Sequence, residues 1–224
     1  MSPIEVEMQQ LKSEIVAMWR MVSVQMKTAM VALATMDKEM SQKVSESEKK
    51  VNSLELRIDR DCENIFALFN PVANDLRLVL ALLRINANLE RIGDIAASVA
   101  KFVLRAEKFN YLELVAKTHT LEMFEEACDL LDDVLVSFET ENAYISEGIF
   151  KRDRTLNEFN KSARGIIIEQ IKKDPEKVES YLSLLSVIRK LERSGDHSKS
   201  IAEEIIFFIE AKVLKHAPKG TDNN

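Results

Sequence analysis

The chain contains two nearly identical hexapeptides. LERIGD occupies residues 89–94, and LERSGD occupies residues 191–196, which is 102 positions later. A dense apolar stretch precedes each copy, over residues 76–89 and 181–191. A repeat at this distance indicates two similar units of about 100 residues each, which is the usual size of a small domain. The fold must therefore be one that can be built twice from one chain.

Turn-forming residues are scarce. The 224 residues include five glycines and four prolines, too few for the many hairpins of a sheet-rich fold, while 46% of the chain is hydrophobic and can form a core. Apolar residues recur at helical spacing almost throughout. The sequence therefore predicts an all-α protein.

Six long helices are expected. They span residues 4–36, 42–69, 71–108, 111–139, 143–173 and 175–214, with a polar break at 37–41 and proline-marked starts after Asn70 and at Asp174. Helices of this length favour elongated bundles. We expect two tandem three-helix bundles over residues 1–108 and 111–215, followed by a disordered tail at 216–224.

Charge and composition exclude several functions. The net charge of −6 without a basic run argues against nucleic-acid binding. The absence of a signal peptide pattern and of any long uncharged apolar run predicts a cytoplasmic protein that meets a membrane only through partners. Cys62 and Cys128 lack CxxC spacing and are expected to be buried thiols. No phosphate loop, dinucleotide or nucleophile motif is present, so we expect no enzymatic activity.

The hexapeptides place two carboxylates on one helix face. Glu90 and Asp94 are four residues apart, which separates them by about 40° around the helix. Like charges at this spacing repel by about 0.2–0.5 kcal/mol, and by more when partly buried. Either arginines or a hard cation should compensate them. The simpler interpretation is a solvated face on which Arg91 and Arg193 form ion pairs of about 0–1 kcal/mol.

A second carboxylate pair favours the metal interpretation. Glu55 and Asp59 show the same spacing on the preceding helix, so an antiparallel turn near Pro71 would bring four carboxylates together. Such a group could hold several metal ions. Gly93 and Gly195 also recur inside helices, where glycine costs about 1 kcal/mol relative to alanine, which suggests close approach of another helix or a ligand.

The second unit is expected to be the poorer site. Glu192 and Asp196 repeat the carboxylate pair of the first hexapeptide. At the offset of 102, however, the position aligned with Glu55 is Asn157, and the position aligned with Asp59 is Lys161. We therefore predict unequal metal occupancy that favours the first unit.

Longer segments resemble one known family. The segments KVNSLELRIDRDC (50–62), NPVANDLRLVLALLRINANLERIGD (70–94) and DPEKVESYLSLLSVIRKLERSGDHSKSIAEE (174–204) are similar to the PhoU family of phosphate-uptake regulators. The resemblance covers essentially the whole chain, including its duplication. It implies two similar three-helix bundles.

The resemblance also implies a function. Members repress the phosphate-starvation response and phosphate uptake as cytoplasmic adaptors. Their partners are the ATPase subunit of the high-affinity phosphate ABC transporter and the phosphate-sensing histidine kinase. The apolar, methionine-rich first helix makes a homodimer a further expectation.

The resemblance implies metal ligands as well. Members carry multinuclear metal on ExxxD motifs, with iron expected first and zinc, manganese or magnesium as alternatives. Carried over to this sequence, the ligands are Glu55, Asp59, Glu90, Asp94, Glu192 and Asp196. Three positions depart from the family pattern, namely Asn157, Ile95 and Asn88, and the first of these weakens the second site.

Two other functions are also built on helical bundles. A carboxylate-bridged di-iron or metal-storage protein is also a helical bundle, but it needs Glu-x-x-His on two helices. None of His119, His197 and His216 has a glutamate three residues before it. A purely structural coiled coil would not explain the repeated glycines and carboxylates. The adaptor remains the leading interpretation.

Overall fold

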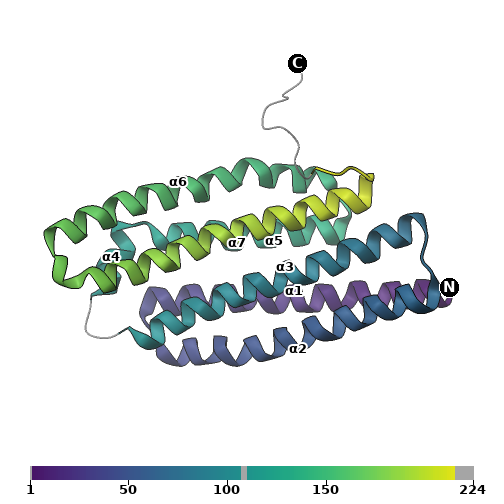
Figure 1. Ribbon diagram of the computed structural model, residues 1–224, viewed down its shortest axis with the longest axis horizontal. Helices are drawn as coiled ribbons and strands as arrows, with labels where there is room; N and C mark the ends of the chain where they lie inside the picture. The colour runs from purple at the N-terminus through teal and green to yellow at the C-terminus, as the bar shows by residue number, and fades with distance from the viewer. Residues whose placement is uncertain (1, 107–109, 215–224) are drawn as a thin grey trace, which may run out of the picture.

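The computed structural model describes residues 2–106 and 110–214, except for the side chain of residue 153, and it is all-α over this part of the chain. Helices α1 (Pro3–Thr35), α2 (Lys38–Phe69) and α3 (Ala73–Arg105) form the first unit (Figure 1). The second unit contains α4 (Tyr111–Lys117), α5 (Thr120–Thr140), α6 (Ala143–Lys173), a 3₁₀ turn (Pro175–Lys177) and α7 (Val178–Glu210). The predicted fold class of two tandem helical bundles is confirmed. The predicted tail at 216–224 lies outside the described residues.

The turn between α1 and α2 is tighter than expected. Met36 adopts a left-handed conformation with φ 52°, and the Asp37 carboxylate accepts hydrogen bonds from the backbone N–H groups of Glu39 (2.8 Å) and Met40 (3.0 Å). An aspartate in this position satisfies amides that have no partner within the helix. The predicted break at 37–41 was therefore wrong for residues 38–41, where the polar residues already belong to α2.

The helix expected over 111–139 is interrupted. Thr118 and His119 separate α4 from α5, and His119 has φ 52°. The buried Thr118 hydroxyl donates to the Leu114 carbonyl at 2.8 Å and contacts the Thr120 hydroxyl at 2.7 Å. Threonine hydroxyls that bond to the backbone compete with the helical ladder, so they can end a helix without glycine or proline. The expectation of six helices was wrong at this point.

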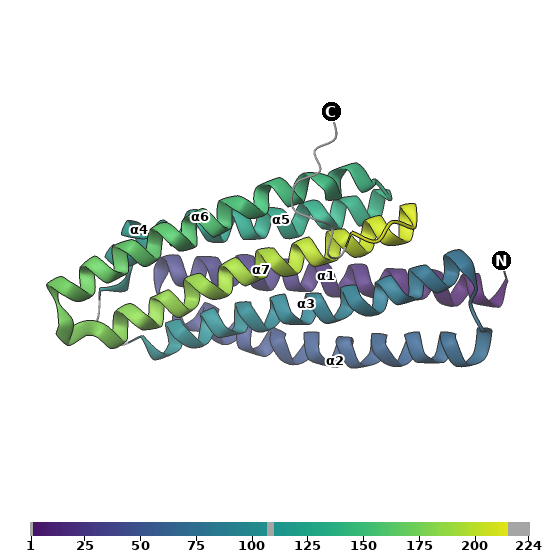
Figure 2. The same ribbon diagram turned by 45° about the horizontal axis from the view of Figure 1, so that its top comes forward.

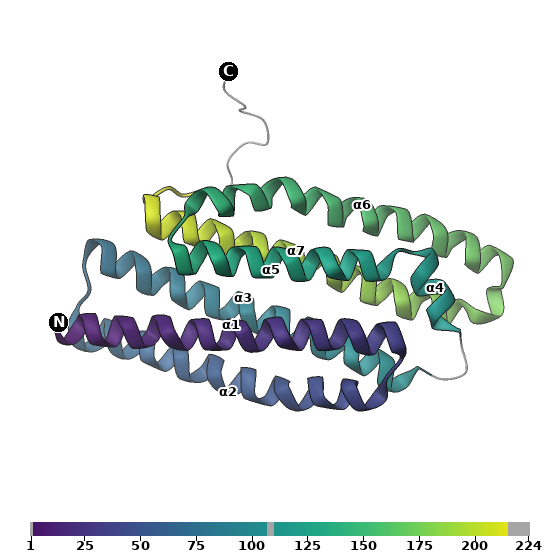
Figure 3. The same cartoon turned by 180° about the vertical axis from the view of Figure 1, so that it is seen from behind.

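The two units pack side by side along their length. α3 lies against α7, and α1 lies against α5, as the front and rear views show (Figures 1 and 3). α2 and α6 are on opposite outer sides of the molecule (Figure 2). This arrangement leaves one long face between α2 and α3 and a corresponding face between α6 and α7. No helix of the described residues is long and apolar enough to cross a membrane.

A single hydrophobic core runs through both units. Trp19 of α1 is fully buried and donates its indole N–H to the Leu131 carbonyl of α5 at 3.1 Å, and its ring lies 5.8 Å from that of Phe138. Three ion pairs flank this contact along α1 and α5, namely Lys12–Glu141, Arg20–Glu139 and Lys27–Asp132. The bundles are thus joined through apolar packing with a charged rim.

The cysteines and central methionines are core residues. Cys62 and Cys128 are free and buried, as predicted, and burial raises the pKa of each thiol to about 12. Such thiols remain protonated and unreactive near neutral pH. Met18 and Met26 of α1 are fully buried. These two methionines therefore belong to the packing of the fold and not to an exposed docking face.

Candidate metal centre

Helices α2 and α3 bring the predicted carboxylates of the first unit together. Burial raises the pKa of Glu55, and the charges of Asp59 and Asp94 raise it further, while Arg91 opposes the shift. Burial likewise raises the pKa of Glu90, with Asp94 and Glu55 adding to the rise. These carboxylates therefore lie within electrostatic range of one another. The face holds more negative charge than its own surroundings balance.

Glu48 belongs to the same group and was missed by the sequence analysis. It lies on α2 two helical turns before Glu55, half buried, and it accepts a hydrogen bond of 2.5 Å from the Gln25 amide of α1. Burial raises the pKa of Glu48 to about 7, and Asp94 and Glu90 contribute. The seven-residue spacing places Glu48 and Glu55 on one face of the helix, and this spacing could have predicted that Glu48 belongs to the group. We refer to Glu48, Glu55, Asp59, Glu90 and Asp94 as the first-unit carboxylate cluster.

Asn86 positions the α2 pair. Its side chain is fully buried on α3, and its amide N–H₂ donates to the Glu55 backbone carbonyl at 2.9 Å and to the Asp59 carboxylate at 2.8 Å. A buried amide is costly unless it is hydrogen-bonded, so these two contacts fix the register of α2 on α3. Asn86 therefore acts on the cluster by orientation.

Gly93 permits the close approach of α1 and α2 to α3. A Cβ atom at this position would lie 3.3 Å from a Glu48 carboxylate oxygen, 3.3 Å from Val51 Cγ1 and 3.4 Å from the Gln25 amide oxygen. The Gln25 amide N–H₂ also approaches the Gly93 carbonyl at 3.4 Å. The expectation that this glycine marks a close helix contact is confirmed. Gly195 is also buried, in α7.

Arg91 supplies positive charge at the edge of the cluster. Its Nε lies 3.4 Å from a Glu90 carboxylate oxygen, and its terminal nitrogen lies 3.8 Å from Asp94. The arginine side chain is 63% exposed, so solvent weakens both interactions. The ion pairs that the simpler interpretation expected of Arg91 are therefore present. They leave the half-buried carboxylates only partly compensated.

The donor chemistry of the cluster fits a hard cation. Carboxylate oxygens are the preferred ligands of magnesium and manganese and also bind iron. Within the described residues, however, no group of three or more His, Cys, Asp or Glu side chains is gathered around a common point that could hold a metal ion. Glu48 and Asp59 instead accept hydrogen bonds from Gln25 and Asn86. The residues present suit a cation by charge and donor type.

The second unit follows a different register from the one predicted. Glu141 and Asn142 repeat the left-handed residue and N-cap of Met36 and Asp37, at an offset of 105. The buried positions of α2 and α6 match at the same offset: Ser41 with Ser146, Val44 with Ile149, Val51 with Leu156, Ile58 with Ala163 and Cys62 with Ile167. The equivalence of Asn157 with Glu55 and of Lys161 with Asp59 was therefore wrong by three residues.

The corrected register still leaves the second unit poorer in carboxylates. Asn160 takes the place of Glu55, and Arg164 takes the place of Asp59. On α7, Glu192 is half buried and Asp196 is exposed, which repeats Glu90 and Asp94 on α3. The carboxylate pair of α3 is thus repeated on α7. The carboxylate pair of α2 is not repeated on α6.

Between the units, α3 and α7 exchange polar contacts. The His197 ring nitrogen Nδ1 lies 2.9 Å from the Asn88 amide oxygen, and burial lowers the pKa of this histidine, with Arg193 and Arg91 adding to the shift. His197 therefore contacts the other repeat. His119 is exposed and lies 3.0 Å from Glu122, as expected of a surface residue, and His216 is outside the described residues.

Comparison with known proteins identifies the repeated unit. The PhoU domain family model matches twice, at residues 15–103 and 120–205. These two segments contain the two LERxGD hexapeptides and most of the long helices. The matches cover well over half of the chain.

Relatives agree along the full length. The chain is 29% identical to the phosphate-specific transport system accessory protein PhoU homolog 1 of Thermotoga maritima, over 98% of this chain and 94% of that protein. It is 28% identical to the PhoU accessory protein of Escherichia coli K12, over 94% and 86%.

Solved structures show the same architecture. The crystal structure of PhoU from Pseudomonas aeruginosa superposes with a TM-score of 0.85 at 27% identity, covering 93% of this chain and 99% of that one. PhoU from Streptococcus pneumoniae also gives a TM-score of 0.85, at 26% identity, over 95% and 99%. The paired domain matches, the full-length relatives and the shared fold together show that the chain belongs to the PhoU family.

Proposed function

We propose that the protein is a regulatory accessory protein of phosphate transport. Its role is to repress phosphate uptake and the phosphate-starvation response when phosphate is plentiful. The observation that carries the proposal is the double PhoU domain match, together with full-length relatives named as accessory proteins of the phosphate-specific transport system. The matching fold of two PhoU crystal structures supports it.

The proposed mechanism is that of a cytoplasmic adaptor without enzymatic activity. The protein bridges the ATPase subunit of a phosphate ABC transporter and a phosphate-sensing histidine kinase, so that the state of the transporter biases the kinase. Long helices on both outer sides suit simultaneous contact with two partners (Figure 2). The net charge of −6 speaks for protein partners over nucleic acid.

We further propose that the first-unit carboxylate cluster holds metal. The raised pKa values of Glu48, Glu55 and Glu90 support this, because burial first, and then neighbouring carboxylates, disfavour the ionised forms that a cation would stabilise. A bound cation would neutralise the cluster. Asn86 and Gly93 would hold α2 and α3 at the spacing that the ligands need, and Arg91 would remain at the rim.

A homodimer is also proposed, on surfaces other than the buried methionines of α1. Large apolar side chains lie exposed on α2, including Leu56 (64% exposed) and Leu68 (74% exposed). The mass of the purified protein in solution, measured by light scattering, tests this directly. A monomeric mass at micromolar concentration would reject the dimer and leave the adaptor proposal intact.

Co-purification tests the adaptor. The tagged chain should retain both the transporter ATPase and the kinase from detergent-solubilised membranes. Deletion of its gene should raise expression of a phosphate-starvation reporter in phosphate-rich medium. A deletion strain with unchanged phosphate signalling, together with loss of both partners in the pull-down, would reject the proposal.

A further inference from the structure

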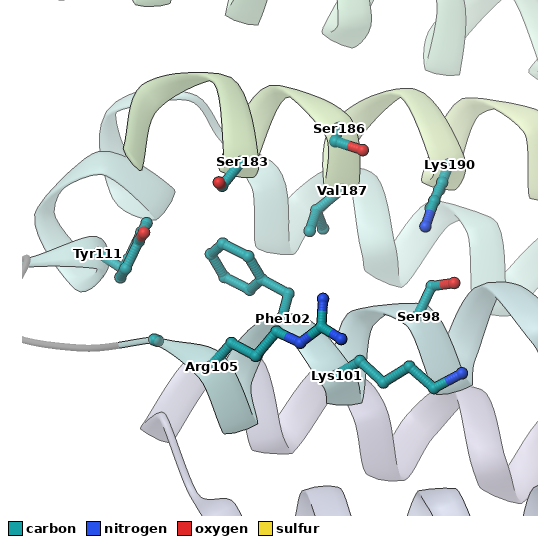
Figure 4. A pocket seen from close by; sticks show the side chains of 10 residues that line it. Ser98, Lys101, Phe102, Arg105, Tyr111, Ser183, Ser186, Val187 and Lys190 are labelled. Atoms are coloured by element: carbon teal, nitrogen blue, oxygen red, sulfur yellow. The ribbon is translucent and has the colours of Figure 1, made fainter. Parts of the chain in front are cut away.

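A second polar site lies between α3 and α7, away from the carboxylate cluster. It is a pocket of about 290 Å³ near the C-terminal end of α3. Figure 4 shows α3 and α7 on its two sides, with Phe102 between them and Tyr111 of α4 at one end. The rings of Phe102 and Tyr111 are in edge-to-face contact with centroids 4.8 Å apart, so two packed aromatic rings close one end of the pocket.

The charged groups of this pocket are all positive among the described residues that line it. Lys101 and Arg105 come from α3, and Lys190 comes from α7 and points toward Ser98 on α3 (Figure 4). In the part of the chain that the structure describes, none of these three cations forms an ion pair. Hydroxyl groups complete the lining, from Ser98, Ser183 and Ser186. Guanidinium, ammonium and hydroxyl groups around one cavity are the donor set of an oxyanion site.

The opposite end of the same α3–α7 interface shows that the fold does not require positive residues at these positions. At the repeat offset of 102, Arg84 corresponds to Ser186, Glu203 to Lys101, and Phe207 to Arg105. Arg84, Glu203 and Phe207 line a pocket of about 210 Å³ at that end. There Arg84 lies 3.0 Å from Glu204, whose side chain is 2% exposed. Among the described residues, the duplicated interface thus contains an ion pair at one end and three cations outside any ion pair at the other.

Helix-end effects do not account for Lys190. A basic residue in the last turn interacts favourably with the helix dipole, and this describes Arg105. Lys190 lies in the interior of α7, 20 residues before its end at Glu210, where the dipole effect has decayed. Its half-buried position toward α3 therefore calls for a different explanation.

We propose that the pocket binds a small phosphate-bearing anion, either orthophosphate or a phosphomonoester. Arg105 would supply the fork of donors that suits phosphate oxygens, and Lys101 and Lys190 would add charge from two sides. Ser98 and Ser186 would complete the hydrogen bonding, since the Ser183 hydroxyl already donates to the Glu179 carbonyl at 2.7 Å. The volume is at the lower limit of ligand pockets, so a small ligand fits better than a polymer. Because α3 and α7 belong to different repeats, the bound anion would link the two units. The inference goes beyond the proposed adaptor role and does not depend on it.

Titration calorimetry tests this site on the full-length protein. The probes are inorganic phosphate and glycerol 3-phosphate, each at fixed ionic strength. The double variant Arg105→Gln with Lys190→Gln is expected to weaken binding at least about tenfold, the usual size of losing charged hydrogen bonds. The matched control is Lys161→Gln with Arg164→Gln, which removes the same charges from exposed positions of α6 and should bind as the unmodified protein does.

The outcomes separate the sources of the ligand. Tighter binding of inorganic phosphate would identify the free anion as the ligand of the pocket. Tighter binding of glycerol 3-phosphate would identify a phosphorylated small molecule as the ligand. Either result supports the site. Saturation by neither probe up to about 10 mM, which corresponds to less than about 3 kcal/mol of binding, would overturn it. Equal loss in the control variant would also overturn it. If the double variant melts at a lower temperature, the exposed Lys101→Gln variant should still weaken phosphate binding about threefold or more.

Discussion

The faces between α2 and α3 and between α6 and α7 share a backbone plan but differ in charge. The first carries the five carboxylates of the first-unit carboxylate cluster, and the buried Asn86 amide bonds to Asp59 among them. In the second, Asn160 and Arg164 replace Glu55 and Asp59, and Ile188 replaces Asn86. Both copies of the hexapeptide bury their leucine and glycine in the helix packing. The difference in charge between the two faces comes from the neighbouring helix, α2 or α6.

The largest expected effect is on bound metal. Glu55→Ala with Asp94→Ala removes one carboxylate from each helix of the first-unit cluster, and we expect at least a tenfold loss of metal, since even residues that only orient ligands change affinity about 10–100-fold. Elemental analysis of protein purified without added metal measures it. Glu192→Ala with Asp196→Ala is the control from the second unit and should lose much less. Unchanged metal in the first variant would remove the assignment of the site to α2 and α3.

Asn86→Ala should destabilise the protein by about 1–3 kcal/mol. The substitution leaves the Glu55 carbonyl and the Asp59 carboxylate without their donor at a buried position. Urea denaturation gives the free energy of unfolding. Asn64→Ala, at an exposed position of α2, should stay within about 0.5 kcal/mol of the unmodified protein. Equal effects at the two asparagines would mean that the amide does not position the cluster.

Glu48→Gln should change how stability depends on pH. The pKa of this carboxyl rises from 4.5 to about 7 on folding, so the folded state retains a proton that the unfolded state releases. Stability is therefore lost as pH rises from about 4.5 through 7. The glutamine variant should be more stable at pH 8 by about 1–2 kcal/mol after allowance for solvent screening, with a flatter profile.

Thermal melts from pH 4.5 to 8 measure the effect of Glu48. Glu158→Gln is the control, because it removes the same charge from an exposed position of α6. Its profile should follow that of the unmodified protein. If the Glu48→Gln variant showed the same dependence of melting temperature on pH as the unmodified protein, the cluster would not resist ionisation of Glu48.

The smallest effects are expected at two helical glycines, where substitution by alanine should change stability in opposite directions. Gly93→Ala should destabilise by about 1 kcal/mol, since crowding against Glu48, Val51 and Gln25 exceeds the gain in helix propensity. Gly165→Ala on α6 meets no atom within 4 Å and should stabilise by about 0.5–1 kcal/mol. Chemical denaturation of both variants checks the contrast. The same sign at both positions would contradict the close contact at Gly93.

The fold followed from the sequence because long amphipathic periods and the duplication each restrict the choices strongly. The interruption at Thr118 and His119 did not, since no glycine or proline marks it and the threonine hydroxyls act through contacts that only the folded chain supplies. The carboxylate pairs on α2 and α3 were found from their spacing. Glu48 was missed because its burial depends on Gln25, which comes from a third helix.

The error in the second unit has a geometric origin. The hexapeptides fix the offset of α3 against α7 at 102, whereas the capped turns fix that of α2 against α6 at 105. A shift of three residues is close to one helical turn of 3.6, so the wrong alignment still placed polar residues near the correct face. One sequence motif could not reveal a length difference that lies outside it.

The core that Trp19 spans has a consequence for how the duplication behaves in folding. Its indole N–H bonds to the second unit from within the first, and the two units have one hydrophobic core in common. Neither half could expose that surface to water without a large loss of stability, so we expect the repeats to fold as one cooperative unit and not as two independent modules. As the sole tryptophan in the chain, Trp19 is also a natural fluorescence reporter of whether the two units remain packed against each other.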